Sequence, residues 1–323
     1  MKVQCELCPK MCLIGPGQSG DCRVRINIDG VLRTVVYGYP CSIAPDPVEK
    51  KPLFHFLPGT KILSIATAGC NLHCLNCQNW EISQANPEDT PATFCPPEKL
   101  VALAKENRFP SLAYTYTEPI IYYEYTYDSA KLARDAGIRN VLVTAGYINP
   151  EPWKKLLKYV DAANMDLKGI TDQFYRDVCS ATLRPVQDAM IIAKASGVWV
   201  EVTNLIIPTL NDKPEQIRQL VRWVRANLGS ETPMHFSRFF PRYKMRHLPQ
   251  TSPQTLDMAR EIAVSEGLDH VYIGNVLSEV GQSTYCPGCK GLLIERSGYT
   301  ILRNRLKDGR CPNCQQEIYG VWK

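Results

Sequence analysis

The sequence predicts an α/β protein whose largest part is a full or partial parallel β/α barrel. Seven short apolar runs recur between residues 62 and 274. Helical patterns separate them, giving strand-then-helix units of about 30 residues, as parallel sheets with right-handed crossovers require. Cysteines instead gather at the two ends of the chain. We therefore expect a Cys-rich N-terminal metal-binding segment and connector over residues 1–60, the barrel over 61–280, and a zinc-ribbon module over 281–323.

The apolar runs are the expected strands of the barrel. They are short and largely apolar, as is typical of parallel strands that are buried on both faces. The expected strands cover residues 62–67, 112–117, 140–144, 162–167, 199–207, 235–240 and 270–274.

The expected helices lie between these runs and end at glycines. Residues 130–136, 186–196, 217–228 and 256–266 are each followed by a glycine, which readily adopts the left-handed conformation that terminates a helix. Pro97-Glu98 and Pro214-Glu215 mark two helix starts. Residues 40–58 contain five prolines and favour an extended connector into the barrel.

Composition restricts the function classes. The chain has 323 residues, with 37 Lys and Arg against 32 Asp and Glu, so the formal charge of +5 does not require a nucleic-acid partner. No apolar run reaches the length of about 18 residues that spans a membrane, and the first residues lack a signal-peptide pattern, so we expect a cytoplasmic protein without a membrane partner. Fourteen Cys and five His in a reducing compartment favour metal ligation by thiolates over disulfides.

The central motif is a cysteine triplet directly after the first expected strand. Cys70, Cys74 and Cys77 have the spacing Cys-x3-Cys-x2-Cys on a short loop. A structural zinc site uses four protein ligands, whereas a [4Fe-4S] cluster held by three thiolates leaves one iron open to a small molecule. The weaker interpretation is a zinc site that borrows a distant fourth ligand.

This triplet resembles the signature of the radical SAM superfamily, in its pyruvate formate-lyase activating enzyme-like branch. Cys5-Glu6-Leu7-Cys8-Pro9, residues 46–59 and Phe239-Phe240-Pro241 resemble the radical SAM enzyme of the AmmeMemoRadiSam system most closely. The resemblance covers nearly the whole chain and implies a barrel of radical SAM type. One departure is Asn76, where the superfamily usually has an aromatic residue before the third cysteine.

The resemblance implies an oxidoreductase. A reduced cluster would cleave S-adenosylmethionine (SAM) to a 5′-deoxyadenosyl radical that abstracts hydrogen from a substrate, such as a glycine of a partner protein. It also implies a low-potential electron donor, such as flavodoxin or ferredoxin, and AMMECR1-like and Memo-like partners. Two alternatives stay open: radical modification of RNA, and a metal-binding interaction protein without turnover.

Polar residues that follow the second, third and fourth expected strands are the candidate SAM contacts. Active sites of parallel barrels lie at the carboxyl ends of the strands, so these residues share one mouth. The resemblance implies that they receive the ammonium, ribose and carboxylate groups of SAM. The candidates are Tyr116, Thr117, Glu118, Thr144, Asp166 and Lys168.

Later strand ends supply the candidate substrate contacts, among which Arg238 could hold a carboxylate or phosphate through two parallel hydrogen bonds. These candidates are Asn204, Arg238, Tyr243 and Asn275, although structural hydrogen bonds in loops are an equally good interpretation of each.

Two further cysteine groups lie at the ends of the chain. Cys286, Cys289, Cys311 and Cys314 form two Cys-x2-Cys pairs, the pattern of a zinc ribbon, and a basic stretch lies between them. Cys5, Cys8, Cys12 and Cys22 favour zinc over a second iron–sulfur cluster, with Cys41 as a substitute ligand. Cys95 and Cys179 are expected to be unligated.

Overall fold

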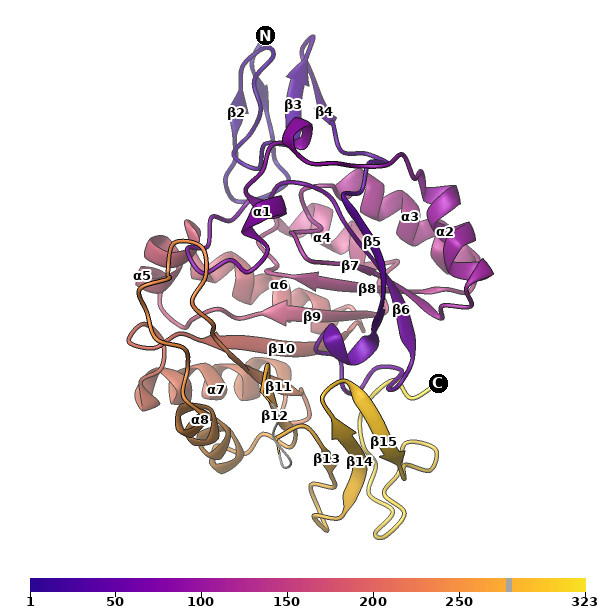
Figure 1. Ribbon diagram of the computed structural model, residues 1–323, viewed down its shortest axis with the longest axis vertical. Helices are drawn as coiled ribbons and strands as arrows, with labels where there is room; N and C mark the ends of the chain where they lie inside the picture. The colour runs from indigo at the N-terminus through magenta and orange to yellow at the C-terminus, as the bar shows by residue number, and fades with distance from the viewer. Residues whose placement is uncertain (277–280) are drawn as a thin grey trace.

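An open, curled sheet of eight strands forms the centre of the protein (Figure 1), which we describe from a computed structural model over residues 1–276 and 281–323. Its order is β12-β11-β10-β9-β8-β7-β6-β5, with β6 to β12 parallel and β5 antiparallel to β6. The strands are β5 (Ser42–Pro47), β6 (Lys61–Ala66), β7 (Ser111–Tyr114), β8 (Arg139–Thr144), β9 (Ala162–Asp166), β10 (Trp199–Ile206), β11 (Met234–Arg238) and β12 (Val271–Gly274). Since β12 and β5 are the two edges, the sheet is a partial barrel.

Helices connect successive parallel strands and cover the outer face of the sheet (Figure 1). The helices are α1 (Trp80–Ser83), α2 (Pro97–Glu106), α3 (Tyr123–Asp135), α4 (Pro150–Leu157), α5 (Asp172–Phe174), α6 (Leu183–Ala195), α7 (Pro214–Leu228) and α8 (Pro253–Ser265), and the single turns are η1 (Val48–Lys50), η2 (Pro87–Asp89) and η3 (Tyr175–Cys179). Apolar side chains of these helices join the main hydrophobic core, with Trp153 fully buried. None of the helices described is long and apolar enough to cross a bilayer.

All seven expected strands are present, and the four glycines expected to end helices have positive φ angles between 74° and 95°. Residues 40–58, expected to form only an extended connector, have a different structure. Part of this segment is β5, which pairs along its length with β6, from Ser42 opposite Ala66 to Pro47 opposite Lys61. Pro45 and Pro47 are compatible with this strand because its outer edge has no neighbouring strand that needs their missing N–H groups.

Small modules flank the sheet at both ends of the chain. Two hairpins form the N-terminal module: β1 (Val3–Gln4) with β2 (Leu13–Ile14), and β3 (Arg25–Ile28) with β4 (Val31–Thr34). A three-stranded antiparallel sheet forms the C-terminal module from β13 (Thr284–Tyr285), β14 (Leu292–Ser297) and β15 (Thr300–Asn304). The last residues return to the connector, where the N–H of Leu57 donates to the carbonyl of Val321 at 2.7 Å.

Candidate active site

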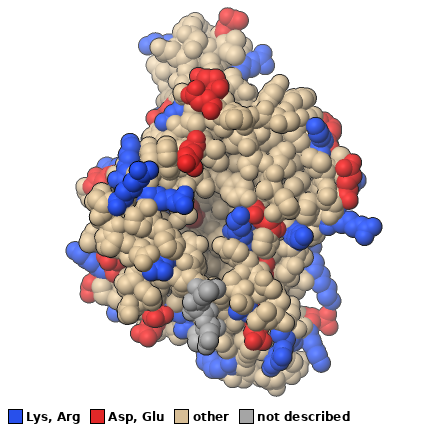
Figure 2. Space-filling view, in the orientation of Figure 1, with Lys and Arg blue, Asp and Glu red and all other residues tan. Residues whose placement is uncertain are grey.

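A cavity of about 740 Å³ opens at the carboxyl ends of the parallel strands. Figure 2 shows it as a hollow in the centre of one face, with Lys and Arg side chains on both sides. The loops after β6 to β9 form one wall, and the connector and the turn between β14 and β15 form the opposite wall. This is the end of a parallel barrel where functional groups are expected.

Cys70, Cys74 and Cys77 line the upper end of this cavity, on the loop that follows β6. Backbone hydrogen bonds fix the loop to η3: the N–H of His73 donates to the carbonyl of Cys179 at 3.0 Å, and the N–H of Leu75 donates to Val178 at 2.9 Å. The sequence therefore places three thiols on a loop whose backbone is held by a separate element.

Gly69 allows this loop to pack closely against the N-terminal module. Its φ of 93° lies in the left-handed region, and a Cβ atom there would lie 2.6 Å from the carbonyl oxygen of Cys22. The position consequently requires glycine, both for its backbone conformation and for its close packing against the N-terminal module.

Hydrogen-bond donors surround the three sulfurs. The hydroxyl of Ser83 lies 3.2 Å from Cys77 Sγ, and the N–H of Leu72 donates to Cys70 Sγ at 3.4 Å. A hydrogen bond from Cys179 and the charge of Lys168 lower the pKa of the Cys74 thiol, whereas burial raises the pKa of Cys70 and Cys77. Cys74 is therefore the thiol of the triplet that is most readily present as the thiolate that a cluster requires.

Glu118 is the buried carboxylate of the cavity. Its side chain accepts hydrogen bonds from the hydroxyl of Thr144 and from the N–H of Ala145 at 2.8 Å. Burial raises its pKa to about 7, although these bonds act in the opposite direction. A group that titrates near neutrality and is held in one orientation is suited to receive an ammonium ion.

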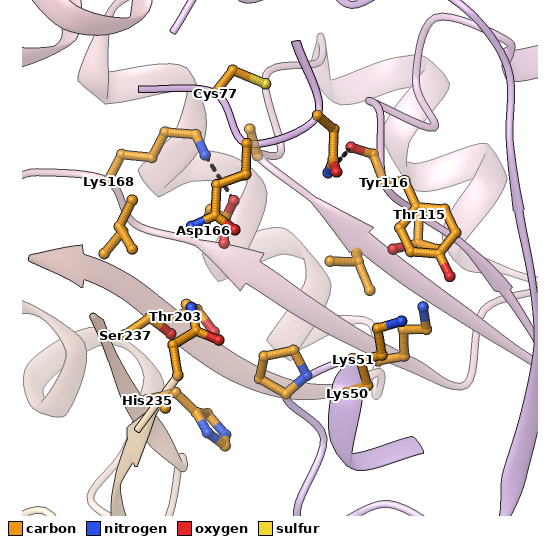
Figure 3. A pocket seen from close by; sticks show the side chains of 18 of the residues that line it. Lys50, Lys51, Cys77, Thr115, Tyr116, Asp166, Lys168, Thr203, His235 and Ser237 are labelled. Carbon is orange, nitrogen blue, oxygen red and sulfur yellow. Dashed lines mark hydrogen bonds and ion pairs between the residues drawn. The ribbon is translucent and has the colours of Figure 1, made fainter. Parts of the chain in front are cut away.

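Asp166 and Lys168 lie together across the cavity, with Lys168 Nζ 2.7 Å from Asp166 Oδ2 (Figure 3). Burial lowers the pKa of Lys168, but the carboxylate of Asp166 and neighbouring thiols raise it well above its usual range. The lysine therefore supplies a fixed positive charge beside the three cysteines.

Two further cations, Lys50 and Lys51 of the connector, line the side of the cavity opposite Lys168 (Figure 3). Lys51 is 1% exposed, its Nζ lies 2.6 Å from Asp46 Oδ2, and it packs 4.2 Å from the ring centre of Tyr116. Tyr116 itself has a φ of 63°, and its hydroxyl donates to Asp46. Neither lysine follows a predicted strand, so the sequence pattern predicts no role for them.

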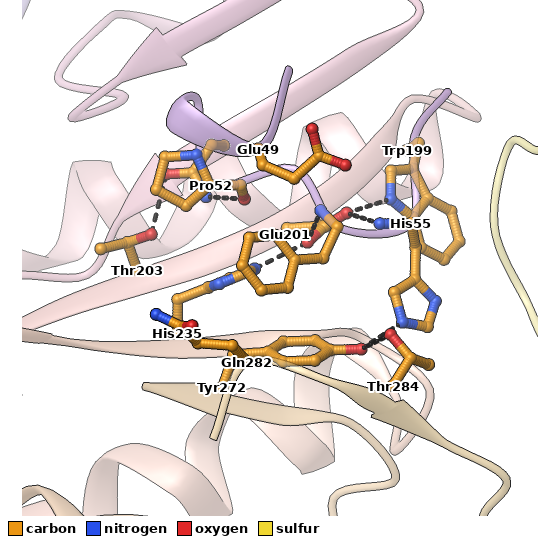
Figure 4. A network of polar contacts seen from close by, with 12 residues as sticks. Glu49, Pro52, His55, Trp199, Glu201, Thr203, His235, Tyr272, Gln282 and Thr284 are labelled. Carbon is orange, nitrogen blue, oxygen red and sulfur yellow. Dashed lines mark hydrogen bonds and ion pairs between the residues drawn. The ribbon is translucent and has the colours of Figure 1, made fainter. Parts of the chain in front are cut away.

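A buried polar network fixes the connector beneath the cavity (Figure 4). The carboxylate of Glu201 accepts the N–H groups of Phe54 and His55 at 2.9 and 2.7 Å, and the indole N–H of Trp199 at 3.0 Å. His235, which lines the cavity, lies 2.7 Å from the same carboxylate. Four partners thus hold one carboxylate that has no exposed surface.

The four candidate substrate contacts do not lie together in the cavity. Asn275 lines the cavity with a φ of 61°, whereas Asn204 donates to the carbonyl of Leu167 at 2.7 Å and lies outside the cavity lining. Arg238 donates to the carbonyl of Thr251 at 2.8 Å, and Tyr243 stacks on Trp80 with ring centres 5.1 Å apart.

All the candidate SAM contacts, in contrast, share this one cavity with the cysteine triplet. The cavity is lined by Cys70, Cys74, Cys77, Tyr116, Thr117, Glu118, Thr144, Asp166 and Lys168. Asn76, at the position before the third cysteine, also lines it. Three thiols, a buried carboxylate and a fixed cation match the needs of an open-sited cluster and a zwitterionic amino acid, so the residues fit both groups.

The C-terminal cysteines form a compact group of a different kind. The sulfurs of Cys286, Cys289, Cys311 and Cys314 all lie within 4.8 Å of one another. Zinc–sulfur bonds of about 2.3 Å in a tetrahedron place sulfurs about 3.8 Å apart, so this module is zinc-ribbon-like. Arg296 belongs to the basic stretch between the two Cys pairs but is buried, while Arg303 and Arg310 of the same stretch are exposed.

The other cysteines occupy several environments. Cys5, Cys8, Cys12 and Cys22 belong to the N-terminal module, beside the central loop. Cys41 contacts the carbonyl of Ala66 at 3.5 Å. Cys95 is buried and its carbonyl accepts a hydrogen bond from Tyr125 at 2.5 Å, whereas Cys179 contacts Cys74 directly.

Comparison with known proteins agrees with this arrangement. Residues 64–224 match the family model of the radical SAM superfamily. An uncharacterized protein of Methanocaldococcus jannaschii, MJ0808, is 50% identical over 319 residues, which cover 98% of this chain and 95% of that protein. Pyruvate formate-lyase-activating enzyme of Clostridium pasteurianum is 28% identical over 166 residues, covering 49% of this chain and 66% of the enzyme.

Solved structures share the fold at low sequence identity. A radical SAM methyltransferase from Sphaerobacter thermophilus has a TM-score of 0.51 at 14% identity, with 68% of each chain covered. Streptococcus suis SuiB bound to the precursor peptide SuiA has a TM-score of 0.50 at 16% identity, covering 68% of this chain and 48% of SuiB. The chain is an enzyme of the radical SAM superfamily, in the branch of the pyruvate formate-lyase-activating enzymes.

Proposed function

We propose that this enzyme cleaves SAM reductively in the cavity and abstracts hydrogen from a glycine of a partner protein. One observation carries the first part: the cysteine triplet and every candidate SAM contact line the same cavity. Relatedness to a pyruvate formate-lyase-activating enzyme supports the second part.

In this proposal Cys70, Cys74 and Cys77 hold a [4Fe-4S] cluster. Superfamily membership implies this cluster and SAM. When bound, the reduced cluster would supply one electron to the sulfonium of SAM, whose S–C5′ bond would break to leave methionine and a 5′-deoxyadenosyl radical. The protein holds the thiolates in place and excludes water from the cavity.

The polar residues of the cavity bind and orient SAM. Glu118, with Thr144 fixing its carboxylate, receives the methionyl ammonium. Lys168 attracts the methionyl carboxylate, and Asp166 holds the lysine at 2.7 Å and is available to the ribose hydroxyls. Backbone atoms near Tyr116 and Thr117 complete the ammonium site.

The substrate enters at the connector and ribbon end of the cavity. Lys51, His235 and Tyr299 line this end, away from the cysteine loop. A peptide loop that brings a glycine Cα to the radical would pass between these side chains. A low-potential flavodoxin or ferredoxin supplies the electron, and the C-terminal cysteines hold one structural zinc.

The first experiment tests SAM cleavage. Anaerobically reconstituted protein and its Cys74→Ser variant are incubated with SAM and dithionite, and 5′-deoxyadenosine is measured by mass spectrometry. We expect product from the wild type and a loss of at least about a hundredfold in the variant, because the cluster loses one of its three ligands. Cys95→Ser is the matched control. Absence of product from the wild type would support the non-catalytic alternative.

The second experiment tests the substrate class. Macromolecules from cells grown with α-deuterated glycine are added to the reaction, and deuterium transfer into 5′-deoxyadenosine is measured. Protease treatment should abolish the transfer, since the hydrogen comes from a protein glycine. Transfer that survives protease but is lost after ribonuclease treatment would favour RNA modification instead.

A further inference from the structure

Four cysteines gather at the base of the N-terminal module. Cys5 and Cys12 face each other across the hairpin, where the N–H of Cys5 donates to the carbonyl of Cys12 at 2.9 Å, and Cys8 lies in the intervening turn. The N–H of Asp21, next to Cys22, donates to Cys12 Sγ at 3.5 Å. Cys22 therefore lies beside the hairpin that carries the other three thiols.

Their spacing differs from that of the C-terminal group. Within residues 1–276 and 281–323, three or more metal-ligating atoms lie mutually within 4.8 Å only at Cys286, Cys289, Cys311 and Cys314. No three sulfurs of the N-terminal group lie mutually within 4.8 Å, and neither do the three sulfurs of the central loop, whereas the sulfurs of a zinc tetrahedron lie about 3.8 Å apart. In a cubane cluster each thiolate binds a different iron, so the sulfurs lie further apart than around a single zinc ion.

A buried cation with a free donor accompanies the four thiols. Arg25 is 8% exposed and makes two 2.8 Å bonds to Glu124, but its Nε has no hydrogen-bond partner among the described residues. An anionic metal–thiolate centre would satisfy this donor, whereas four neutral thiols would leave it unpaired.

The N-terminal group also contacts the loop that carries the central cysteines. The side chain of Asn71, next to Cys70, is a neighbour of Cys8. His73, next to Cys74, lies 3.0 Å from Asp21, which precedes Cys22. Two residues of the central loop therefore face the N-terminal group, and a short path joins the two cysteine groups.

We propose that Cys5, Cys8, Cys12 and Cys22 hold a second iron–sulfur cluster, which passes electrons to the cluster on Cys70, Cys74 and Cys77. The relay rests on the proposed function, since it supplies the electron that SAM cleavage consumes. A low-potential one-electron donor reduces the N-terminal cluster, which is reoxidised as the central cluster gains the same electron. Full ligation by four thiolates leaves this cluster without an open iron, which suits electron transfer.

The decisive experiment removes the central cluster and counts metals. The variant with Cys70→Ser, Cys74→Ser and Cys77→Ser is reconstituted anaerobically, and its iron, acid-labile sulfide and zinc are measured. We expect about four irons and one zinc per chain, and an electron paramagnetic resonance signal after reduction. A variant without iron and with about two zincs per chain would overturn the proposal and leave the proposed function intact.

A complementary variant, Cys8→Ser, tests the relay. It should retain about four irons and a signal that changes on addition of SAM, because the open-sited cluster remains. With dithionite, a small reductant that can enter the cavity, we expect 5′-deoxyadenosine formation within about twofold of the wild type. With a flavodoxin as donor we expect a loss of at least about tenfold.

Matched controls separate the outcomes. Cys95→Ser, which alters a buried cysteine outside both groups, should change neither metal content nor rate, and Cys12→Ser should reproduce Cys8→Ser. Equal rates for wild type and Cys8→Ser with flavodoxin would overturn the relay. Loss of product in Cys8→Ser with both donors, while the SAM-dependent signal persists, would also overturn the relay, because dithionite reduces the central cluster directly. Absence of product from the wild type with dithionite would instead count against the proposed function.

Discussion

Glu118 is the residue on which SAM affinity should depend most. Glu118→Gln keeps the shape and the acceptor oxygen but removes the charge that faces the ammonium. Charge-assisted hydrogen bonds contribute about 1.5–3 kcal/mol, so we expect the dissociation constant of SAM to rise by roughly ten- to a hundredfold. Equilibrium dialysis with anaerobic holoenzyme measures it, with the exposed Glu151→Gln as control.

The pH dependence of SAM binding gives this assignment a second test. Burial raises the pKa of Glu118 to about 7. Below that pH the carboxyl group of Glu118 is protonated in the enzyme without SAM. It must then release this proton before it can pair with the ammonium, so SAM binds more weakly. Wild-type affinity should therefore increase from about pH 6 to about pH 8, while Glu118→Gln shows a flat profile. Parallel profiles would contradict the role of this carboxylate.

Asp46 should be essential for stability because it neutralises a buried ammonium. The side chains of Asp46 and Lys51 are 5% and 1% exposed and lie 2.6 Å apart. Removing one partner of such a pair leaves an uncompensated charge and costs about 3–5 kcal/mol. Urea unfolding of Asp46→Asn measures this loss, with the surface substitution Asp188→Asn as control.

The sign of the pH effect follows from Lys51. Burial lowers its pKa from 10.5 to about 8 in the presence of Asp46. Without Asp46 the pKa falls further, so the folded variant loses its proton at a pH where the wild type keeps it. The stability deficit of Asp46→Asn should then narrow as the pH rises from about 6 to about 8. A deficit that is constant over this range would count against the buried pair.

At the residue scale, sequence reasoning found the groups that immediately follow strands. Glu118, Thr144 and Asp166 could be located because strand ends share one edge of a parallel sheet. Lys51 and Tyr299 could not, because they reach the cavity through contacts between distant segments. Arg296, for example, donates to Phe54, 242 residues away, and no periodic pattern encodes such a contact.

Among the elements, β14 fastens the C-terminal module to the connector through Arg296. The guanidinium donates to the carbonyl of Phe54 at 2.7 Å and to the hydroxyl of Thr284 at 2.8 Å, and lies 3.9 Å from Glu49. Arg296→Ala would leave these buried acceptors unpaired, so we expect a loss of about 3–5 kcal/mol in the free energy of unfolding.

Arg303 on the neighbouring strand β15 is the matched control, since it is exposed and 4.0 Å from Glu295. Arg303→Ala should change the free energy of unfolding by no more than about 0.5 kcal/mol. Chemical denaturation of both variants compares them. Similar losses would show that Arg296 has no special part in fastening β14.

The elements themselves differ in how well the sequence specified them. Parallel strands such as β8 and β10 are buried on both faces, so their apolar runs stand out. β5 could not be recognised from the sequence, because it is an edge strand with prolines at positions 45 and 47. This composition predicts an extended connector instead of a strand. Its pairing with β6 depends on the tertiary arrangement and not on local composition.

At the scale of the whole molecule, both terminal modules contribute to a site that the barrel alone does not complete. The N-terminal module packs Cys22 against Gly69 at the cysteine loop, and the C-terminal module places Gly298 and Tyr299 in the opposite wall. The barrel supplies the SAM contacts between them. We therefore expect changes in either module to alter electron supply or substrate access while SAM binding persists.

The zinc proposed for the C-terminal module offers the sharpest test of this division. The apolar core of the module is small, with Leu293, Ile294 and Ile318 beside the cysteines, so its folding should depend on the metal. Cys289→Ser should remove about one zinc per chain and increase hydrogen exchange across β14 and β15 by at least about tenfold. Iron content and SAM affinity should stay unchanged, because the proposed ligands of iron and SAM lie on the barrel and in the N-terminal module. Hydrogen-exchange mass spectrometry and metal analysis measure these effects, with Cys95→Ser as control.

Loss of iron or of SAM binding in Cys289→Ser would show that the barrel site depends on the ribbon. Unchanged hydrogen exchange would show that the ribbon folds without its metal.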